Sequence, residues 1–362
     1  MRVLLLADRV FAAHERALIE RVAVGLVSEG VDVHCALPAH HDAGGAPFTL
    51  AREPVIYNDR GLAFTQRIRA AQVARQIAGE DPSDAIDIVH VFGGSAWGMG
   101  RELGDIFDCP VAYEIWRVGM ADKAARIGPR SEGREGFFAP DTPIERALVK
   151  AGVGESVRLT PWGAVVPQDA KQLFETDRTH AVVLMSSGRE REQCIAAFEG
   201  LIGAIEKRDD VLVFVNASAA EGGGIWKRAK ALGVLNRLTI VEQMEDRRDL
   251  VLRCDMLIYP DARHEQRTVL LDSMAAGMVI VAARDELVTI IKDNQTASIV
   301  ETPSKDEWQE KISSLLENVE HARSLGKRAR AEIQHHRRAG VHIASLVDAY
   351  AWLTEVGAPR SV

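Results

Sequence analysis

Short apolar runs alternate with stretches of helical period along almost the whole chain. Residues 2–7 have the composition of a buried strand, and residues 31–37 repeat it. Between them, Leu18, Val22 and Leu26 mark one face of a helix. Such alternation is typical of parallel sheets with helices on their faces. The chain is therefore predicted to be an α/β protein built from doubly wound, Rossmann-like sheets.

The alternation forms two series, one in each half of the chain. In the first half, further strands are predicted at residues 86–92, 110–113 and 157–160, with helices near 68–77 and 144–150. In the second half, strands are predicted at residues 181–185, 211–215, 238–241, 256–259, 279–282 and 297–300. Only helical periodicity follows residue 304. Two sheets are therefore expected.

The length of 362 residues exceeds the size at which a single hydrophobic core usually stops growing. We expect an N-terminal domain at residues 1–170 and a C-terminal domain at residues 171–335. The polar, patternless stretch 171–179 is expected to link them, and a final helix within residues 336–362 to cross back to the first domain. Two such domains are expected to face each other across a ligand cleft.

Composition and charge exclude several classes of protein. The formal net charge is −8, so no nucleic-acid partner is expected, because such proteins concentrate excess Lys and Arg on one face. Four cysteines are scattered singly without metal-ligand spacing, which indicates reduced, structural thiols. The sequence has neither a signal-peptide core nor an apolar run of membrane-spanning length. A cytoplasmic protein is expected, with peripheral membrane association and oligomeric state left open.

Residues 119–138 interrupt the pattern. Gly, Arg, Lys and acidic residues replace the periodic apolar positions there. A stretch of this length without periodicity is predicted to be a mobile surface loop or lid.

The segment Ser186-Ser187-Gly188-Arg189 follows a predicted strand and precedes a predicted helix. Such a turn offers backbone N–H groups and a helix N-terminus to a phosphate, and Arg189 and Arg191 add positive charge. In the alternative interpretation, Gly188 only allows a tight turn and both arginines face solvent. The residues alone leave both interpretations open.

Residues 264–277 comprise most of the polar loop and the helix that follow the strand at 256–259. Ligands of open α/β sheets bind at the carboxyl ends of the strands, which places a pocket at this loop. Asp272, in the first turns of the helix, is a candidate acceptor of hydrogen bonds from ribose hydroxyls. Its alternative role is to complement the helix dipole.

The same segment resembles a known family. Its sequence Leu-Leu-Asp-Ser-Met-Ala-Ala-Gly-Met-Val-Ile-Val-Ala at residues 270–282 is similar to the Leu-Leu-Glu-Ala-Met-Ala-Ala-Gly-x-Pro-Val-Val-Ala of the group 1 glycosyltransferases (family 4). Asp-Ile-Val-His-Val at 87–91, Pro-Trp-Gly-Ala-Val at 161–165 and Gly-Arg at 188–189 follow the family's order. At the start of the chain, a strand, a turn at residues 12–15 and a helix are expected. The resemblance implies the GT-B fold.

The resemblance also implies an activity. Members of the family move a sugar from a nucleotide-diphosphate donor to an acceptor with retention at the anomeric carbon, generally without a metal. It implies a UDP- or GDP-type sugar as substrate, no cofactor, and a glycan, lipid or small-molecule acceptor. Charge that develops on the leaving diphosphate requires fixed positive charge nearby. Candidates for this phosphate site are Gly188, Arg189, Arg191, Arg267 and Thr268, with Asp272 at the ribose.

The chain departs from the family at positions that flank the donor. Two glutamates eight positions apart are usual there, whereas this chain has His264 and Asp272. The adjacent Glu265 replaces the first glutamate if the loop is shifted by one residue. In the N-terminal domain, Glu114 stands where a His-Gly pair often closes a strand. His264, Glu265 and Glu114 are therefore the candidate catalytic residues.

Candidate acceptor-side residues lie in the first domain. Ala13, His14 and Glu15 stand near the family's glycine-rich turn, and His90 occupies the position of its strand histidine. Placement on a helix surface is the alternative for His14 and Glu15. For His90 the alternative is a histidine satisfied within the sheet.

The sequence thus predicts a retaining glycosyltransferase. The alternative is a catalytically weakened relative that binds a nucleotide sugar or glycan, or serves as an assembly subunit. The changed glutamate, the shortened phosphate turn and the missing N-terminal glycines motivate it. Epimerisation or hydrolysis of a sugar nucleotide on the same fold is a third option.

Overall fold

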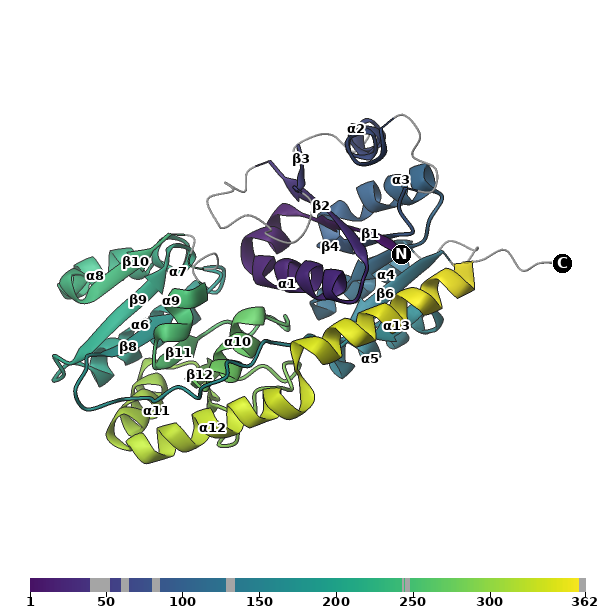
Figure 1. Cartoon of the computed structure of the whole chain (residues 1–362). Coiled ribbons are helices and arrows are strands. Elements are labelled where there is room, and N and C mark those ends of the chain that lie inside the picture. The colour runs from purple at the N-terminus through teal and green to yellow at the C-terminus, as the bar shows by residue number, and fades with distance from the viewer. Residues whose placement is uncertain are drawn as a thin grey trace. The chain divides into compact units, whose positions relative to one another are not determined.

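The computed structural model describes residues 1–39, 53–59, 65–79, 85–127, 134–242, 244 and 248–357. The chain forms two compact units. Unit 1 comprises Met1–Gly163 and Ala339–Val362, and unit 2 comprises Ala164–Arg338. Each unit is built around one parallel sheet that carries helices (Figure 1). The predicted pair of doubly wound, Rossmann-like sheets is confirmed.

Unit 1 contains a seven-stranded sheet in the order β3-β2-β1-β4-β5-β6-β7. Its strands are β1 (Arg2–Ala7), β2 (Asp32–Pro38), β3 (Val55–Tyr57), β4 (Ile88–Phe92), β5 (Val111–Glu114), β6 (Glu135–Ala139) and β7 (Val157–Leu159). Its helices are α1 (Arg9–Ser28), α2 (Gln66–Ala78), α3 (Trp97–Phe107), α4 (Ala121–Ile127), α5 (Thr142–Lys150) and α13 (Ala339–Gly357). All strand pairs are parallel.

The last helix, α13, belongs to unit 1 although unit 2 precedes it in the chain. It lies beside α1 (Figure 1), where Ile343 packs so closely on Gly25 that a Cβ there would come within 2.4 Å of the isoleucine side chain. Trp352 takes a cation–π contact from Arg158 of β7 at 3.7 Å. These contacts hold α13 on unit 1, although unit 2 lies between Gly163 and α13 in the sequence.

Unit 2 contains a six-stranded sheet in the order β10-β9-β8-β11-β12-β13. Its strands are β8 (His180–Leu184), β9 (Val211–Asn216), β10 (Leu238–Val241), β11 (Met256–Tyr259), β12 (Val279–Ala283) and β13 (Ser298–Val300). Its helices are α6 (Arg191–Ala204), α7 (Ala217–Glu221), α8 (Ile225–Leu232), α9 (Arg248–Arg253), α10 (Thr268–Ala276), α11 (Lys305–Glu317) and α12 (Val319–His336).

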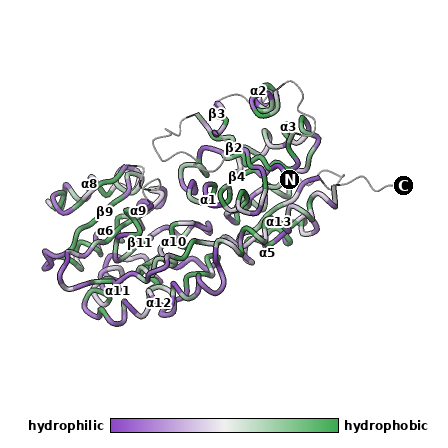
Figure 2. The backbone as a smooth tube through the Cα atoms, in the orientation of Figure 1, coloured by the Kyte–Doolittle hydropathy of each residue, from purple (hydrophilic) through white to green (hydrophobic). Residues whose placement is uncertain are grey.

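The central strands of unit 2 are apolar because helices cover the sheet. Figure 2 shows hydrophobic residues along β9 and β11 and more hydrophilic ones along α11 and α12. Helix α11 buries Trp308 against Gly200 of α6, where an added Cβ would lie 2.4 Å from the tryptophan Cβ. Small residues therefore set how closely these helices approach.

The prediction of a mobile loop or lid at residues 119–138 is wrong where the structure describes it. Ala121–Ile127 forms α4, and Glu135–Ala139 forms β6, a buried strand between β5 and β7; residues 128–133 lie outside the described residues. The strand was missed because its apolar run is short and begins with an acid. That acid, Glu135, is buried but accepts 2.6 Å bonds from Arg101 and a 2.9 Å bond from Tyr113.

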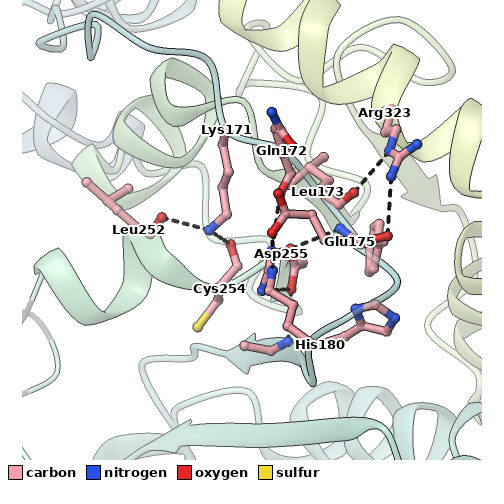
Figure 3. A network of polar contacts seen from close by, with 12 residues as sticks. Lys171, Gln172, Leu173, Glu175, His180, Leu252, Cys254, Asp255 and Arg323 are labelled. Atoms are coloured by element: carbon pink, nitrogen blue, oxygen red, sulfur yellow. Dashed lines mark hydrogen bonds and ion pairs between the residues drawn. The ribbon is translucent and has the colours of Figure 1, made fainter.

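The predicted linker at residues 171–179 packs on unit 2, and the boundary between the units falls earlier, at Gly163/Ala164. Leu173 and Phe174 are buried in the core of unit 2. Lys171 donates hydrogen bonds to the backbone oxygens of Leu252 and Cys254, and burial lowers its pKa to about 8 (Figure 3). The polar side chains of this segment thus take part in contacts with unit 2, while its two apolar residues enter the core.

The four cysteines are free and buried. Burial raises the pKa of each thiol to about 12, so thiolate is scarce at neutral pH and the thiols are unreactive. Among the described residues, no helix is both long and apolar enough to cross a membrane.

Candidate functional site

The candidate site of unit 2 lies where the order of its strands reverses. β8 and β11 are neighbours at the centre of the sheet; the chain adds β9 and β10 on one side and β12 and β13 on the other. The loops that leave such a pair diverge, which opens a crevice at the carboxyl ends of the strands. The turn at residues 185–190 follows β8, and the loop at residues 260–267 follows β11.

The turn after β8 is closed by its own hydrogen bonds. The Ser187 N–H donates to Asp261 Oδ2 at 2.7 Å, and the Gly188 N–H donates to Ser186 Oγ at 3.0 Å. Two of the amides that the sequence offered to a phosphate are thus engaged. Gly188 has φ +71°, and a Cβ there would lie 2.2 Å from Ser218 O. The glycine is required by the turn itself.

Two buried polar residues that the sequence analysis missed hold this turn. Asp261 is 3% exposed and also accepts a 2.6 Å bond from Ser186 Oγ. Asn216, which ends β9, accepts from the Ser186 N–H and donates to the Ser186 carbonyl oxygen. The crevice therefore has a rigid floor, whose geometry is set before any ligand arrives.

The two arginines of the turn have different surroundings. Arg189 is exposed. Arg191, also exposed, lies against Gly224 and lines a hollow of about 430 Å³ together with Trp226 and Lys227. The guanidinium of Arg191 thus lies on the α7–α8 side of unit 2. Of the two arginines, we therefore keep Arg189 as the candidate phosphate contact in the crevice.

Charged residues of the loop after β11 are largely paired with one another. Arg263 Nε lies 3.3 Å from Glu265 Oε1, and Arg263 Nη1 lies 3.9 Å from Glu190 Oε1. Glu190 also accepts a 3.2 Å bond from the Ala262 N–H. Beneath the loop the space is about 10 Å³, room for about one water molecule. A ligand must therefore bind on the outer side of this loop.

Beyond the loop, helix α10 begins at Thr268, and its N-cap residue Arg267 makes no side-chain capping bond. Arg267 is 3% exposed and donates a 3.1 Å bond to the Tyr259 hydroxyl. Thr268 Oγ1 accepts from Arg248 of α9, whose Nε lies 3.8 Å from Asp272 Oδ2. Arg267 and Thr268 thus lie at the positive end of α10, and Asp272 lies one turn further along the helix, beside a second arginine, Arg248.

His264 has a left-handed backbone, with φ +57°. Its N–H and its Nδ1 both lie 2.6 Å from oxygens of Asp285, which follows β12. The sequence identified His264 as a candidate but gave no signal for Asp285, which lies 21 residues away.

Unit 1 has its own reversal of strand order, between β1 and β4. Asp8, directly after β1, is the N-cap of α1 and accepts 2.9 Å bonds from both the amide and the hydroxyl of Ser95, which follows β4. The predicted turn at residues 12–15 is wrong, because this cap starts the helix at Arg9. Ala13 and His14 lie within α1, and Glu15 is buried at a kink in it, with φ −127° and ψ 27°.

His90 and Glu114 are buried within unit 1. His90 is 0% and Glu114 1% exposed. Glu114 accepts a 2.7 Å bond from Trp162 Nε1 and lies 3.1 Å from His90 Nε2, and His90 Nδ1 lies 2.7 Å from the Tyr350 hydroxyl of α13. This arrangement matches the structural interpretation of His90 and gives Glu114 the same role.

Two polar residues that the sequence analysis did not identify, Asp8 and Asp261, share a sequence signal. Asp8 and Asp261 each stand just after a buried strand at a reversal of strand order, where a polar side chain meets the neighbouring loop. In the described part of the chain, no group of three or more His, Cys, Asp or Glu side chains is arranged to hold a metal ion.

Comparison with known families supports the resemblance seen in the sequence. Residues 192–332 match the family model described as "Glycosyl transferases group 1". The matched segment contains β9 to β13 and the loop after β11, so the resemblance to the group 1 glycosyltransferases is confirmed in unit 2. No match was found among proteins with curated functions.

Solved structures share the fold over the whole chain. HepE from Anabaena in complex with UDP and glucose superposes with a TM-score of 0.72 at 13% identity and covers 97% of this chain and 100% of its own. Sucrose-phosphate synthase from Thermosynechococcus elongatus gives 0.73 at 13%, covering 98% and 100%. A putative UDP-N-acetylglucosamine 2-epimerase from Listeria monocytogenes gives 0.62 at 15%, covering 96% and 95%. The chain has the GT-B fold.

Proposed function

We propose that this chain, with its GT-B fold and its group 1 glycosyltransferase segment at residues 192–332, is a retaining glycosyltransferase. It moves a sugar from a nucleotide-diphosphate donor to a glycan, lipid or small-molecule acceptor. One observation supports this proposal most directly. Of the two loops that border the crevice of unit 2, the loop after β11 lies within the matched segment and the turn after β8 lies just before it.

The donor diphosphate binds at the start of α10 in this proposal. Arg267 brings a permanent positive charge into a buried setting, and the N-terminus of α10 adds the positive end of its dipole. Arg189 extends from the turn after β8. Charge on the departing diphosphate is stabilised by such fixed donors without any rearrangement at the moment of reaction. Thr268 belongs to this phosphate site, and Asp272 takes the ribose side.

UDP is the first nucleotide to test, because a structural neighbour, HepE, was solved with UDP and glucose. The acceptor contacts unit 1 near Asp8 and Ser95, where the strand order of that unit reverses. His14, in the second turn of α1, is retained as the acceptor-side candidate. Glu265 and His264 remain the catalytic candidates of unit 2.

A second candidate function is binding without turnover, as in a weakened relative or an assembly subunit. The observation that favours it is the closed turn after β8, whose Ser187 and Gly188 amides are bonded to Asp261 and Ser186. A phosphate in that turn would find the Ser187 amide bonded to a carboxylate and the Gly188 amide bonded to a hydroxyl.

Measured release of nucleotide from a panel of UDP- and GDP-sugars distinguishes these functions. We expect release that depends on an added glycan or lipid acceptor, with the anomeric configuration of the donor retained in the product. Release without acceptor would instead indicate hydrolysis, and conversion of the donor into another sugar nucleotide without release would indicate epimerisation. Binding of a nucleotide sugar that is neither cleaved nor converted, across the panel, would contradict transfer and support the binding function.

A further inference from the structure

Lys123 of α4 lies where two neighbouring strands of the unit 1 sheet end. Helix α4 follows β5 in the chain, and Lys123 Nζ donates a hydrogen bond to the carbonyl oxygen of Gly94, in the loop after β4. The ammonium also lies 4.7 Å from the centre of the Trp97 ring, in a cation–π contact. Because β4 is one of the two strands at the reversal of strand order, this ammonium lies at the edge where such sheets bind ligands.

Two arginines lie close enough to Lys123 to affect its titration. Burial lowers the pKa of Lys123 below its ordinary value, and the charges of Arg126 and Arg117 lower it further, against the opposite effect of Asp8. Arg126 is exposed, and it forms no hydrogen bond or ion pair with any residue that the structure describes. Like charges at one place repel one another, so an anion that binds among them is stabilised by all of them.

The nearby acid does not balance these cations. Asp8 is 4% exposed, and its two oxygens accept hydrogen bonds from the Phe11 N–H and from the amide and hydroxyl of Ser95. The Asp8 carboxylate is thus committed to the cap of α1 and to the loop after β4. Arg9, the next residue, has a carboxylate of its own, because its Nε lies 3.1 Å from Asp59 Oδ2. Positive charge from α4 therefore remains available to a ligand at this edge of the sheet.

We propose that the acceptor of this glycosyltransferase carries a negatively charged group, a phosphate or a carboxylate, that binds to Lys123 and Arg126 of unit 1. This rests on the proposed function, which places the acceptor near Asp8 and Ser95. The ammonium of Lys123 is bonded to Gly94, the residue next to Ser95, so it lies beside that acceptor position. Of the three N–H groups of an ammonium, Gly94 engages one, and the others are left to the anion.

Two substitutions remove the charges one at a time. Lys123→Met removes the ammonium but keeps an unbranched apolar side chain over Trp97. Arg126→Gln changes an exposed side chain, and such substitutions seldom alter stability, so this variant tests the site even where Lys123→Met folds poorly. Lys150→Gln, which removes an exposed lysine of α5, is the matched control.

Titration calorimetry with glucose, glucose 6-phosphate and glucuronate measures what the negative charge contributes to binding. We expect at least one of the two anions to bind the parent protein about 10-fold or more tightly than glucose, as charged hydrogen bonds allow. Lys123→Met should abolish this gain, Arg126→Gln should reduce it by about threefold, and Lys150→Gln should retain it. Arg267→Ala should also retain it, which excludes binding of the anion at the start of α10.

The identity of the favoured anion decides between the two kinds of acceptor. A gain for glucose 6-phosphate alone indicates a phosphate, and a gain for glucuronate alone indicates a carboxylate. Equal binding of glucose and both anions overturns the proposal, as does a gain that survives in Lys123→Met or is lost in Arg267→Ala. Failure of UDP and GDP alike to bind the parent protein contradicts the proposed function instead, and the sugar titrations then still decide whether unit 1 binds an anionic sugar.

Discussion

Replacing Asp255 by alanine is expected to lower the free energy of unfolding of unit 2 by about 3–5 kcal/mol, the usual result of breaking a buried ion pair. Asp255 is 0% exposed and accepts bonds from both terminal nitrogens of Arg178 and from the N–H groups of Phe174 and Ala181. The substitution leaves the Phe174 and Ala181 amides without their acceptor and removes the buried partner of Arg178, which is itself 32% exposed and keeps its contact with Glu175. Figure 3 shows this carboxylate among the residues that attach residues 171–180 to the sheet.

Hydrogen exchange in increasing urea, followed by peptide mass spectrometry, reports the stability of each unit separately. The control is Asp210→Ala, which removes a carboxylate that also pairs with an arginine, Arg208, but is 48% exposed. We expect the control to lose less than about 1 kcal/mol. Equal losses in the two variants would show that the Asp255 network does not hold unit 2 together.

Replacing Glu114 by alanine is expected to destabilise unit 1 by about 3–5 kcal/mol, because an unpaired buried group and a cavity arise together. The Trp162 Nε1–H loses its 2.7 Å acceptor, and His90 loses the partner of its Nε2. His90 in turn contacts the Tyr350 hydroxyl. In Glu114→Ala, hydrogen exchange of the backbone amides is therefore expected to become faster in α13 as well as in β4 and β5.

Two variants calibrate this result, measured in the same way. Tyr350→Phe removes one hydroxyl at the end of the network and should cost about 1–2 kcal/mol. Glu155→Ala removes an exposed glutamate of unit 1 and should change stability by less than about 0.5 kcal/mol. A Glu114→Ala protein as stable as Glu155→Ala would contradict the structural role assigned to Glu114.

Periodicity was sufficient to predict most of the fold. The six strands of unit 2 lie within two residues of the predicted ranges, because apolar residues dominate each of them. β6 was not predicted, because it begins with Glu135, an acid that the interior accommodates only through its bonds from Arg101 and Tyr113. A contact between residues 34 positions apart leaves no periodic trace in the sequence.

Prediction of the site was less complete, for a related reason. Residues 270–282 carried the resemblance that placed the crevice in unit 2, and Arg267, Thr268 and Asp272 are gathered there. The sequence could not show that Asp261 accepts the hydrogen bond of the Ser187 N–H, or that Asp285 contacts the His264 ring. Each of these contacts joins two loops that are separate in the sequence. From the sequence, Glu114 is likewise a candidate catalytic residue at the end of a strand. In the structure it is buried against Trp162 and His90.

The central claim is that unit 2 binds a nucleotide diphosphate at the start of α10, and the most direct test is the melting temperature of the whole chain with millimolar UDP or GDP. At one hundred times its dissociation constant a ligand adds about 2.7 kcal/mol, so one nucleotide should raise the melting temperature by several degrees. Arg267→Ala should abolish the rise. Arg208→Ala should retain it, because Arg208 lies before the amino end of β9, whereas the proposed site lies at the carboxyl ends of the strands. No rise with either nucleotide, or an undiminished rise in Arg267→Ala, would contradict the account.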